Sequence, residues 1–331
     1  MKKVGKYLIF LLILFLILLF TFIFIGRTKP NKVEWGVAFS SKHADQLGLD
    51  WKETYLAILN DLGVKNIRII THWDLIEPEN NKYEFEYLDW QIKKAKKKDA
   101  KVILNIGMKT ARWPECHLPG WIRGEEKKEQ QKEVKELLNK IVERYKHEKA
   151  IKAWQVENEP FFVFGDCPWY DKEFLKEEIN LVKDIDKKDR PIVISESGEW
   201  SFWTKSARLG DIVGTTLYKK MWFAEFKTYY TSPLTPIFYK RRADIINKIF
   251  NKDVICIELQ AEPWGPKLLY DISLEEQKKT MDLEQFKDMV EFAKKADLKE
   301  YYFWGAEWWY FMKEKQNQPE IWNEAKKEID F

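Results

Sequence analysis

The chain has 331 residues, a length that fits either two ordinary domains or one large α/β barrel. Its 56 basic and 53 acidic residues are spread along the whole sequence and leave a net charge of +3, so we expect no nucleic-acid partner. Tryptophan is abundant, at 16 residues, and indole rings either fill a core or stack on flat apolar ligand faces such as those of sugars.

The first predicted element is an apolar segment near the N-terminus. It runs from Leu8 to Ile25 and consists of Leu, Ile and Phe apart from Thr21. At about 1.5 Å per residue, a helix of this length covers most of a bilayer core. The segment does not end in the small residues of a cleavage site, so we predict an uncleaved transmembrane helix rather than a signal peptide.

The charges that flank this segment are nearly balanced, with Lys2, Lys3 and Lys6 before it and Arg27, Lys29 and Lys32 after it. The free amino terminus tilts the expected orientation towards an N-terminus inside the cell. We therefore predict that residues 1–31 form a membrane anchor with a short stem. Residues 32–331 are expected on the extracytoplasmic side of the cell membrane, held by this single span.

After Lys32, short β-rich apolar runs alternate with longer amphipathic segments. The predicted strands are Glu34–Phe39, Asn66–Ile70, Lys101–Ile106, Lys152–Val156, Pro191–Ser195, Asp211–Thr216, Asp253–Ile257 and Glu300–Trp304. Predicted helices include Leu88–Lys98, Lys127–Lys146, Lys172–Lys187, Pro236–Phe250 and Leu274–Lys295. This alternation predicts an α/β fold of the (β/α)8 TIM-barrel type over residues 32–331. A doubly wound sheet is the alternative, but the glycine-rich loop that usually follows its first strand is missing.

Two cysteines fall in neighbouring predicted loops. Cys116 follows the third strand and Cys167 the fourth, so they could pair as a disulfide in an oxidising compartment. Two separate thiols are equally compatible with the sequence, because spacing alone gives no distance. Cys256 lies within a predicted strand and is expected to be a buried thiol.

Two glutamates stand where predicted strands reach the same barrel face. Glu159 follows the fourth strand in the sequence Asn-Glu-Pro, and Glu258 ends the seventh. Glycoside hydrolysis needs such a pair, one acid that protonates the leaving oxygen and one carboxylate that attacks the anomeric carbon. Burial and a negative neighbour would keep Glu159 protonated as the acid. Glu258 is the expected nucleophile, and Glu262 on the following loop is the alternative nucleophile. The alternative role for Glu159 is to cap a following helix.

Several neighbours could support these two acids. Arg68, inside the apolar second strand, needs a buried anionic partner, either Glu258 or another barrel acid. Tyr218 could donate to the carboxylate of Glu258, and Asn158 could bind a sugar hydroxyl. Trp304 is a candidate floor for the sugar, although core filling is nearly as compatible. Further substrate-binding candidates on this face are Trp73, Trp113, Trp264, Trp308 and Glu307.

Taken together, these features resemble the retaining glycoside hydrolases of clan A. The segment Trp73-Asp74-Leu75-Ile76-Glu77-Pro78, with the following Tyr83-Glu84-Phe85, is similar to the second-strand region of family 5 cellulases and mannanases, family 39 xylosidases and family 42 β-galactosidases. The resemblance covers roughly Glu34 to Trp309. It implies that Glu159 is the acid/base, that Glu258 is the nucleophile, and that the anomeric configuration is retained through a glycosyl-enzyme intermediate.

The function expected from the sequence is a membrane-anchored β-glycoside hydrolase that acts on a polysaccharide or oligosaccharide. The alternative is a membrane-tethered barrel that binds glycan without cleaving it. Other chemistries lack their motifs: the four histidines are scattered, no Cys-x-x-Cys occurs, and no Gly-x-Ser-x-Gly elbow occurs. We therefore expect no metal site and no cofactor.

Overall fold

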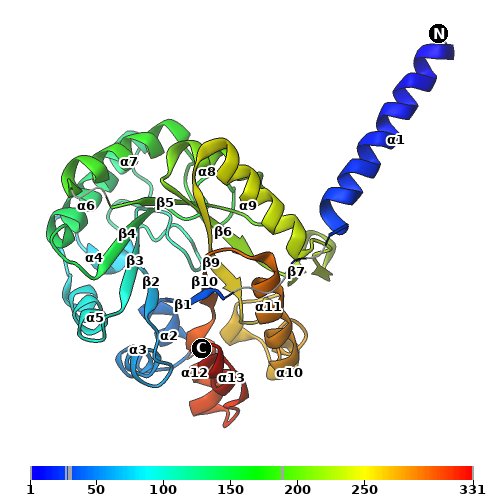
Figure 1. Cartoon of the computed structure of the whole chain (residues 1–331). Coiled ribbons are helices and arrows are strands. Elements are labelled where there is room, and N and C mark those ends of the chain that lie inside the picture. The colour runs from blue at the N-terminus through cyan, green and yellow to red at the C-terminus, as the bar shows by residue number, and fades with distance from the viewer. Residues whose placement is uncertain (1, 27, 29–31, 188–189, 330–331) are drawn as a thin grey trace.

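The computed structural model describes residues 2–26, 28, 32–187 and 190–329. Eight parallel strands close into a barrel in the order β1-β10-β9-β6-β5-β4-β3-β2, ringed by helices (Figure 1). These strands are β1 Glu34–Phe39, β2 Asn66–Ile70, β3 Lys101–Ile106, β4 Ile151–Val156, β5 Ile192–Glu196, β6 Ile212–Leu217, β9 Asp253–Gln260 and β10 Glu300–Trp304. The predicted (β/α)8 barrel is thus confirmed.

Helices lie between the strands along the chain, and two more follow the last strand, β10. They are α2 Ser41–Gln46, α3 Trp51–Asn60, α4 Trp73–Ile76, α5 Glu86–Lys97, α6 Lys127–Tyr145, α7 Lys172–Asp186, α8 Thr204–Leu209, α9 Pro236–Phe250, α10 Leu274–Gln277, α11 Leu283–Ala296, α12 Ala306–Lys315 and α13 Glu320–Ile329. Short helical turns η1 Ala224–Phe226 and η2 Leu269–Asp271 lie in the loops, and β7 Lys220–Phe223 pairs antiparallel with β8 Thr228–Thr231 as a hairpin after β6.

The helix predicted over Leu274–Lys295 is two helices in the structure. Asp282 stands between α10 and α11, and its side chain accepts a hydrogen bond from the backbone N–H of Gln285. A carboxylate in this position caps the first turn of a new helix, which favours a break over a continuous helix.

Clusters of buried apolar side chains pack on both sides of the barrel strands. The larger core lies between strands and helices, and a second cluster of Ile103, Ala153, Val193, Ile255, Ile257 and Tyr302 fills the barrel interior. Gly36 makes room for the ring of Tyr302, since a Cβ atom there would lie 2.9 Å from a ring carbon. These side chains fill the interior of the barrel.

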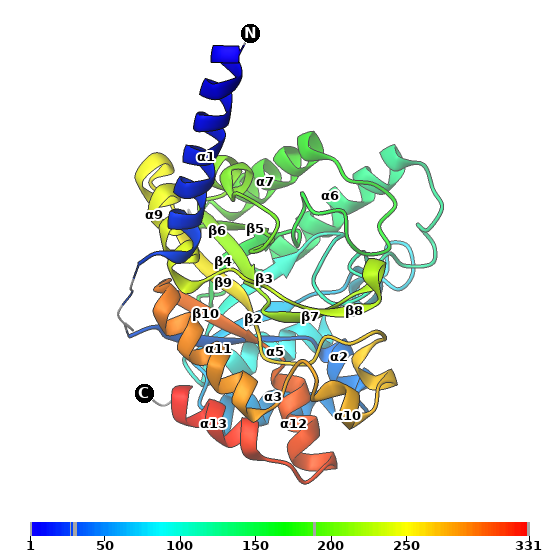
Figure 2. The ribbon, with the colours of Figure 1, turned by 90° about the vertical axis from the view of Figure 1, so that its right-hand side faces the viewer.

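The N-terminal helix α1, Lys2–Phe24, projects from the barrel, and its C-terminal end lies against α9 (Figures 1 and 2). Its part from Lys6 to Phe24 is long and apolar enough to cross a membrane, and the same property is found in signal sequences. The guanidinium of Arg241 on α9 donates hydrogen bonds to the carbonyl oxygens of Thr21 and Phe22, in the last turn of α1, and of Ile25, just after it. The predicted stem residues Arg27 and 29–31 lie outside the described residues.

A disulfide joins Cys116 to Cys167, with their Cα atoms 5.1 Å apart. It ties the loop after β3 to the loop after β4, both on the face of the barrel where the strands end. Cys256 is a buried free thiol, as predicted. The two tied loops cover part of the barrel mouth and shape the site described next.

Candidate active site

Glu159 lies just beyond the end of β4. Its backbone N–H donates to Ser195 Oγ at 2.8 Å, and its carboxyl Oε1 accepts from Thr216 Oγ1 at 3.5 Å. Glu157 and Glu159 both have positive φ, 60° and 42°, a conformation that costs non-glycine residues free energy and occurs often at functional sites. The carboxylate of Glu157 offsets this by accepting the backbone N–H groups of Met108 and Lys109 at 2.8 and 2.6 Å.

Glu258 reaches the barrel mouth because β9 contains a bulge. Thr215 pairs with Cys256, but the next residue, Thr216, pairs with Glu258, so β9 has one extra residue. The register between β9 and β10 shifts at the same place, again with one extra residue on β9. Ile257 packs in the barrel interior, and strict alternation would therefore turn Glu258 towards the helices. The bulge lets both residues face inward, and β9 continues to Gln260 instead of ending at Ile257 as predicted.

Two donors hold the carboxylate of Glu258. Arg68 Nη1 donates to one oxygen at 2.8 Å, and Tyr218 Oη donates to the other at 2.8 Å. Arg68 is fully buried and also donates to Gln155 and Asn158, at 2.7 and 2.9 Å. The sequence predicted both contacts to Glu258, and the structure confirms them. Hydrogen bonds to a charged group of this kind stabilise its ionised form.

The electrostatic surroundings of Glu159 are the opposite. Burial raises the pKa of Glu159 well above its usual value, and the negative charge of Glu258 raises it further, while Lys109 acts against both. Only 9% of Glu159 is exposed, so water cannot compensate the charge. The pKa of Tyr218 is also raised, by burial and then by Glu258, which keeps its hydroxyl group protonated as a donor. The mouth thus holds one carboxyl group whose pKa is raised, Glu159, and one that accepts hydrogen bonds from Arg68 and Tyr218, Glu258.

A third carboxyl group at the mouth, that of Glu115 from the loop after β3, was not predicted from the sequence. Its Oε2 accepts from Asn158 Nδ2 at 3.1 Å, and burial raises its pKa to about 7. The signal that could have revealed it is its neighbour Cys116, because pairing with Cys167 brings Glu115 next to the segment after β4.

Lys109 was also missed. Its ammonium group is buried and donates to the carbonyl oxygens of Glu159 and Phe162, at 3.0 Å each. It therefore fixes the backbone that carries Glu159. In the sequence it is one lysine among many, and only its position after β3 distinguishes it.

Glu262 does not share the environment of Glu258. Burial raises its pKa, but the guanidinium of Arg112 and then His43 outweigh burial and leave the pKa at about 2. Arg112 also donates to Glu307 at 3.2 Å and lies with its guanidinium carbon 3.8 Å from the ring centroid of Trp304. One face of Trp304 is therefore already covered by protein.

Some predicted binding residues lie inside the protein. Trp73 has no exposed surface and donates its indole N–H to Glu77, and Trp308 is 1% exposed. Glu307 is also fully buried, and its oxygens accept from Arg112 and from the backbone N–H of Ser40. These three side chains fill the structure behind the mouth and offer no surface to a ligand, which corrects the expectation for Trp73, Trp308 and Glu307.

Other predicted aromatic residues lie at the mouth. Trp264 is half-buried and meets Tyr218 edge to face, with ring centroids 4.9 Å apart. Phe164 lies 6.1 Å from Trp264 and 6.2 Å from Trp113, which is 48% exposed. Among the described residues, no group of three or more His, Cys, Asp and Glu side chains is arranged to hold a metal ion.

The family described as Cellulase (glycosyl hydrolase family 5) matches residues 36–217, more than half of the chain. The chain belongs to glycosyl hydrolase family 5. The resemblance to clan A hydrolases predicted from the sequence is thereby confirmed. The matched range includes Arg68, Asn158 and Glu159, and it ends before Glu258.

Among curated proteins, the chain is similar to Beta-galactosidase BgaA of Clostridium cellulovorans, with 27% identity over 198 residues. That alignment covers 53% of this chain and 29% of the relative, so the chain spans less than a third of the length of this curated relative.

Solved structures share the fold. GH5_18 from Streptomyces cattleya in complex with GlcNAc has a TM-score of 0.58 at 14% identity, over 83% of this chain and 71% of that chain. Xylanase 10B from Thermotoga maritima has a TM-score of 0.56 at 18% identity, over 82% of both chains. A cold-adapted β-galactosidase from Rahnella sp. R3 has a TM-score of 0.54 at 14% identity, over 85% and 51%. At these identities the likeness shows the fold alone.

Proposed function

We propose that this family 5 chain is a retaining β-glycoside hydrolase that cleaves O-glycosidic bonds in a polysaccharide or oligosaccharide by double displacement. The supporting observation is that two carboxyl groups at the same barrel mouth, those of Glu159 and Glu258, have different surroundings. Arg68 and Tyr218 both donate to Glu258, at 2.8 Å each, while burial and the charge of Glu258 raise the pKa of Glu159. A nucleophile needs the first environment and a general acid needs the second.

In the first step, a carboxylate oxygen of Glu258 attacks the anomeric carbon. Glu159 gives its proton to the oxygen of the leaving group as the glycosidic bond breaks, which forms a covalent glycosyl ester on Glu258. The ester is uncharged, so the interaction with Glu258 that helped to raise the pKa of Glu159 is lost. The pKa of Glu159 therefore falls, so its carboxylate stays ionised and is ready to accept a proton in the second step.

In the second step, Glu159 takes a proton from a water molecule, whose oxygen attacks the same carbon and releases Glu258. Two inversions give net retention. Asn158 supports both steps, because Arg68 holds its Oδ1 at 2.9 Å and its Nδ2 carries two hydrogens, one for Glu115 and one for a sugar hydroxyl. A retaining enzyme of this kind requires the two carboxyl groups to lie about 5–5.5 Å apart.

The proposed substrate class is taken from the similar proteins, and it names a class of sugars rather than one sugar. A β-galactosidase, a xylanase and an enzyme bound to GlcNAc are all among the proteins that this chain resembles. We therefore propose a β-linked sugar substrate, with Trp264 as a substrate contact beside Tyr218. Trp304 is 7% exposed and Arg112 lies over its ring, so it contributes only through the small part of its ring that remains exposed.

We further propose that residues 1–31 anchor the barrel, residues 32–331, on the extracytoplasmic side of the cell membrane. The apolar helix α1 supports this, because its side chains from Tyr7 to Phe20 are largely exposed and need an apolar surrounding. The disulfide between Cys116 and Cys167 supports an oxidising compartment. Carbonate extraction of membranes tests the anchor: the full chain should stay in the membrane pellet, and release into the wash would contradict it.

The catalytic proposal is tested with a panel of aryl β-glycosides and β-linked polysaccharides. Glu258→Gln should lower kcat on the order of 10⁴-fold or more, because an amide cannot form the ester. Glu225→Gln is the matched control, since Glu225 is exposed in the turn between β7 and β8. A Glu258→Gln enzyme with nearly normal turnover would refute the assignment.

A further inference from the structure

The N-terminal helix α1 is bound to the barrel at its end. Phe22 meets Phe238 of α9 edge to face, with ring centroids 5.8 Å apart. Arg241, also on α9, donates to the carbonyl oxygens of Phe22 and Ile25, at 2.9 and 2.8 Å. Residues 6–20 of α1 are exposed, so only the end of the helix touches α9. The end of α1 therefore lies directly on the first turns of α9.

The length of α1 places this contact at a membrane boundary. Its apolar part, Lys6–Phe24, has 19 residues. At about 1.5 Å per residue these residues span roughly 28 Å, close to the ~30 Å thickness of the hydrocarbon core of a bilayer. A membrane anchor therefore needs all of this length, Phe22 included, inside the bilayer. Because Phe238 contacts Phe22, the first turns of α9 must then lie at the surface of the same bilayer.

One side of α9 continues from this contact as an exposed apolar surface. Ile245 and Ile249 follow Arg241 at intervals of four residues, so the three side chains lie in a row along the helix. Ile245 is 42% exposed and Ile249 is 67% exposed. Lys248 belongs to the same side of the helix and is also exposed. We refer to Arg241, Ile245, Lys248 and Ile249 as the α9 face.

The charge beside the α9 face does not oppose a lipid contact. Asp244 is exposed, but Lys240 donates to its two carboxylate oxygens at 3.1 and 3.3 Å, so its charge is paired. Apolar side chains in a row with a lysine among them are typical of helices that lie flat on a membrane. In such helices the apolar side chains enter the bilayer, while the ammonium groups contact lipid phosphates.

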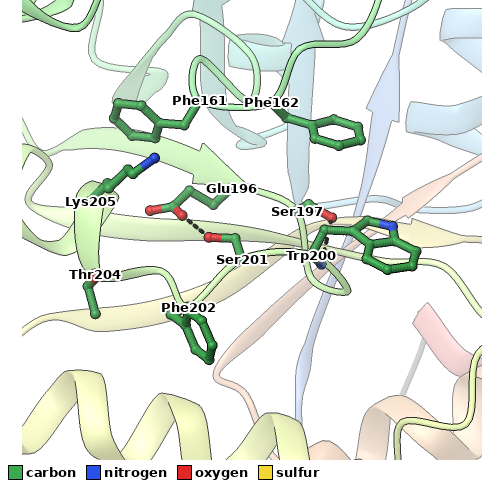
Figure 3. Close-up of a pocket in the computed structure, with 9 residues that line it drawn as sticks. All are labelled: Phe161, Phe162, Glu196, Ser197, Trp200, Ser201, Phe202, Thr204 and Lys205. Atoms are coloured by element: carbon green, nitrogen blue, oxygen red, sulfur yellow. Dashed lines mark hydrogen bonds between the residues drawn. The ribbon is translucent and has the colours of Figure 1, made fainter.

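Another exposed apolar side chain lies on a segment that α9 binds. Arg242 of α9 donates to the carbonyl oxygen of Ser201, and the next residue, Phe202, is 82% exposed. Figure 3 shows the ring of Phe202 on the side of its loop opposite Phe161 and Phe162. Exposed apolar side chains therefore gather on α9 and on the loop beside it.

We propose, on the basis of the membrane anchor proposed above, that the α9 face lies on the surface of the bilayer that α1 spans. Ile245 and Ile249 contact the lipid, and Lys248 contacts its phosphate groups. A single span leaves a barrel free to turn about the axis of the span. The second contact, along α9, removes this freedom and fixes how the barrel stands on the membrane.

The test uses the full chain in lipid nanodiscs that contain a lipid with a spin label near its headgroup. A fluorophore is attached to Ile245→Cys or to Ile249→Cys, and the remaining free thiol, Cys256, is buried. Tyr270→Cys is the matched control, because Tyr270 is 40% exposed and precedes α10, which lies away from α1 in Figures 1 and 2. Spin-label quenching should be at least about two-fold stronger for both isoleucine variants than for the control. Leu14→Cys, in the middle of α1, reports the span itself through a lipid labelled deep in its acyl chain.

The outcomes separate the α9 face from the anchor. Quenching at Leu14→Cys without extra quenching at Ile245→Cys and Ile249→Cys would overturn the lipid contact and leave the anchor standing. No quenching at Leu14→Cys would refute the anchor, and the lipid contact with it. A blue-shifted emission at Ile249→Cys without quenching by the labelled lipid would mean that a second copy of the chain covers the α9 face, which also overturns the proposal.

Discussion

The hydrogen bond from Tyr218 to Glu258 gives a prediction whose size can be worked from the structure. Tyr218→Phe removes only the hydroxyl group that donates to Glu258 at 2.8 Å, and it keeps the ring that packs against Trp264. A hydrogen bond to a charged group contributes about 1.5–3 kcal/mol. With about 1.4 kcal/mol per factor of ten, kcat/KM should fall roughly 10- to 150-fold.

The pH dependence of the same variant is read on its basic limb, which reports the raised pKa of Glu159. Burial of Glu159 and the charge of Glu258 both remain in Tyr218→Phe, so that limb should stay in place while kcat/KM falls. Arg68 remains, so the enzyme should fold and retain measurable activity. The assay is steady-state hydrolysis of an aryl β-glycoside across pH 4–9.

A matched control separates this effect from a general loss of stability. Tyr145 donates its hydroxyl group to Asp89 at 2.7 Å, on the helices and away from the mouth. Tyr145→Phe should lower the thermal midpoint without changing kcat/KM or its pH profile. If Tyr218→Phe behaved like this control and kept its full kcat/KM, the role given to Tyr218 and Glu258 would be wrong.

Three further results are expected. Glu159→Gln should lower kcat/KM on the order of 10²–10⁴-fold for substrates with poor leaving groups but spare kcat/KM for dinitrophenyl glycosides, whose leaving group needs no proton in the first step; an equal loss of kcat/KM on both would contradict its role as acid. The pKa of Glu115 is about 7 in the folded protein and 4.5 in its ordinary range, so between these pH values the folded state binds more protons than the unfolded state. The free energy of unfolding should therefore fall by roughly 3 kcal/mol as the pH rises through this range. Chemical denaturation of Glu115→Gln should show that slope reduced, and an unchanged slope would refute it. Cys116→Ser should lower the free energy of unfolding by about 2–4 kcal/mol, measured by denaturation, and an unaffected midpoint would show that the tie to Cys167 is dispensable.

The strands could be predicted closely because their signal is local. Runs of β-branched and aromatic residues recur between amphipathic segments, and the bounds of β1, β2, β3 and β10 agree with the prediction residue for residue. The contacts of Arg68 were also predictable, since a fully buried guanidinium must find an anionic partner and the barrel offers few. These inferences needed only periodicity and the cost of burying a charge.

The remaining features depend on contacts between distant segments. The bulge in β9 leaves no mark in the sequence around Ile257 and Glu258, yet it decides which way the carboxylate points. Whether a tryptophan is exposed also depends on its neighbours: Trp73 and Trp264 both follow strands, and only Trp264 lies beside the site. Arg112 reaches Glu262 and Glu307 across 150 and 195 residues, a separation that no local pattern indicates.

The covalent intermediate tests the central claim most directly. A 2-deoxy-2-fluoro β-glycoside with a good leaving group should trap the enzyme as a stable ester, which mass spectrometry locates after trypsin digestion. Glu258 and Glu262 share the tryptic peptide Asp253–Lys267, so fragment ions must separate them. A label on Glu258 is the expected result. A label on Glu262, or hydrolysis of the reagent with no covalent adduct, would contradict the mechanism.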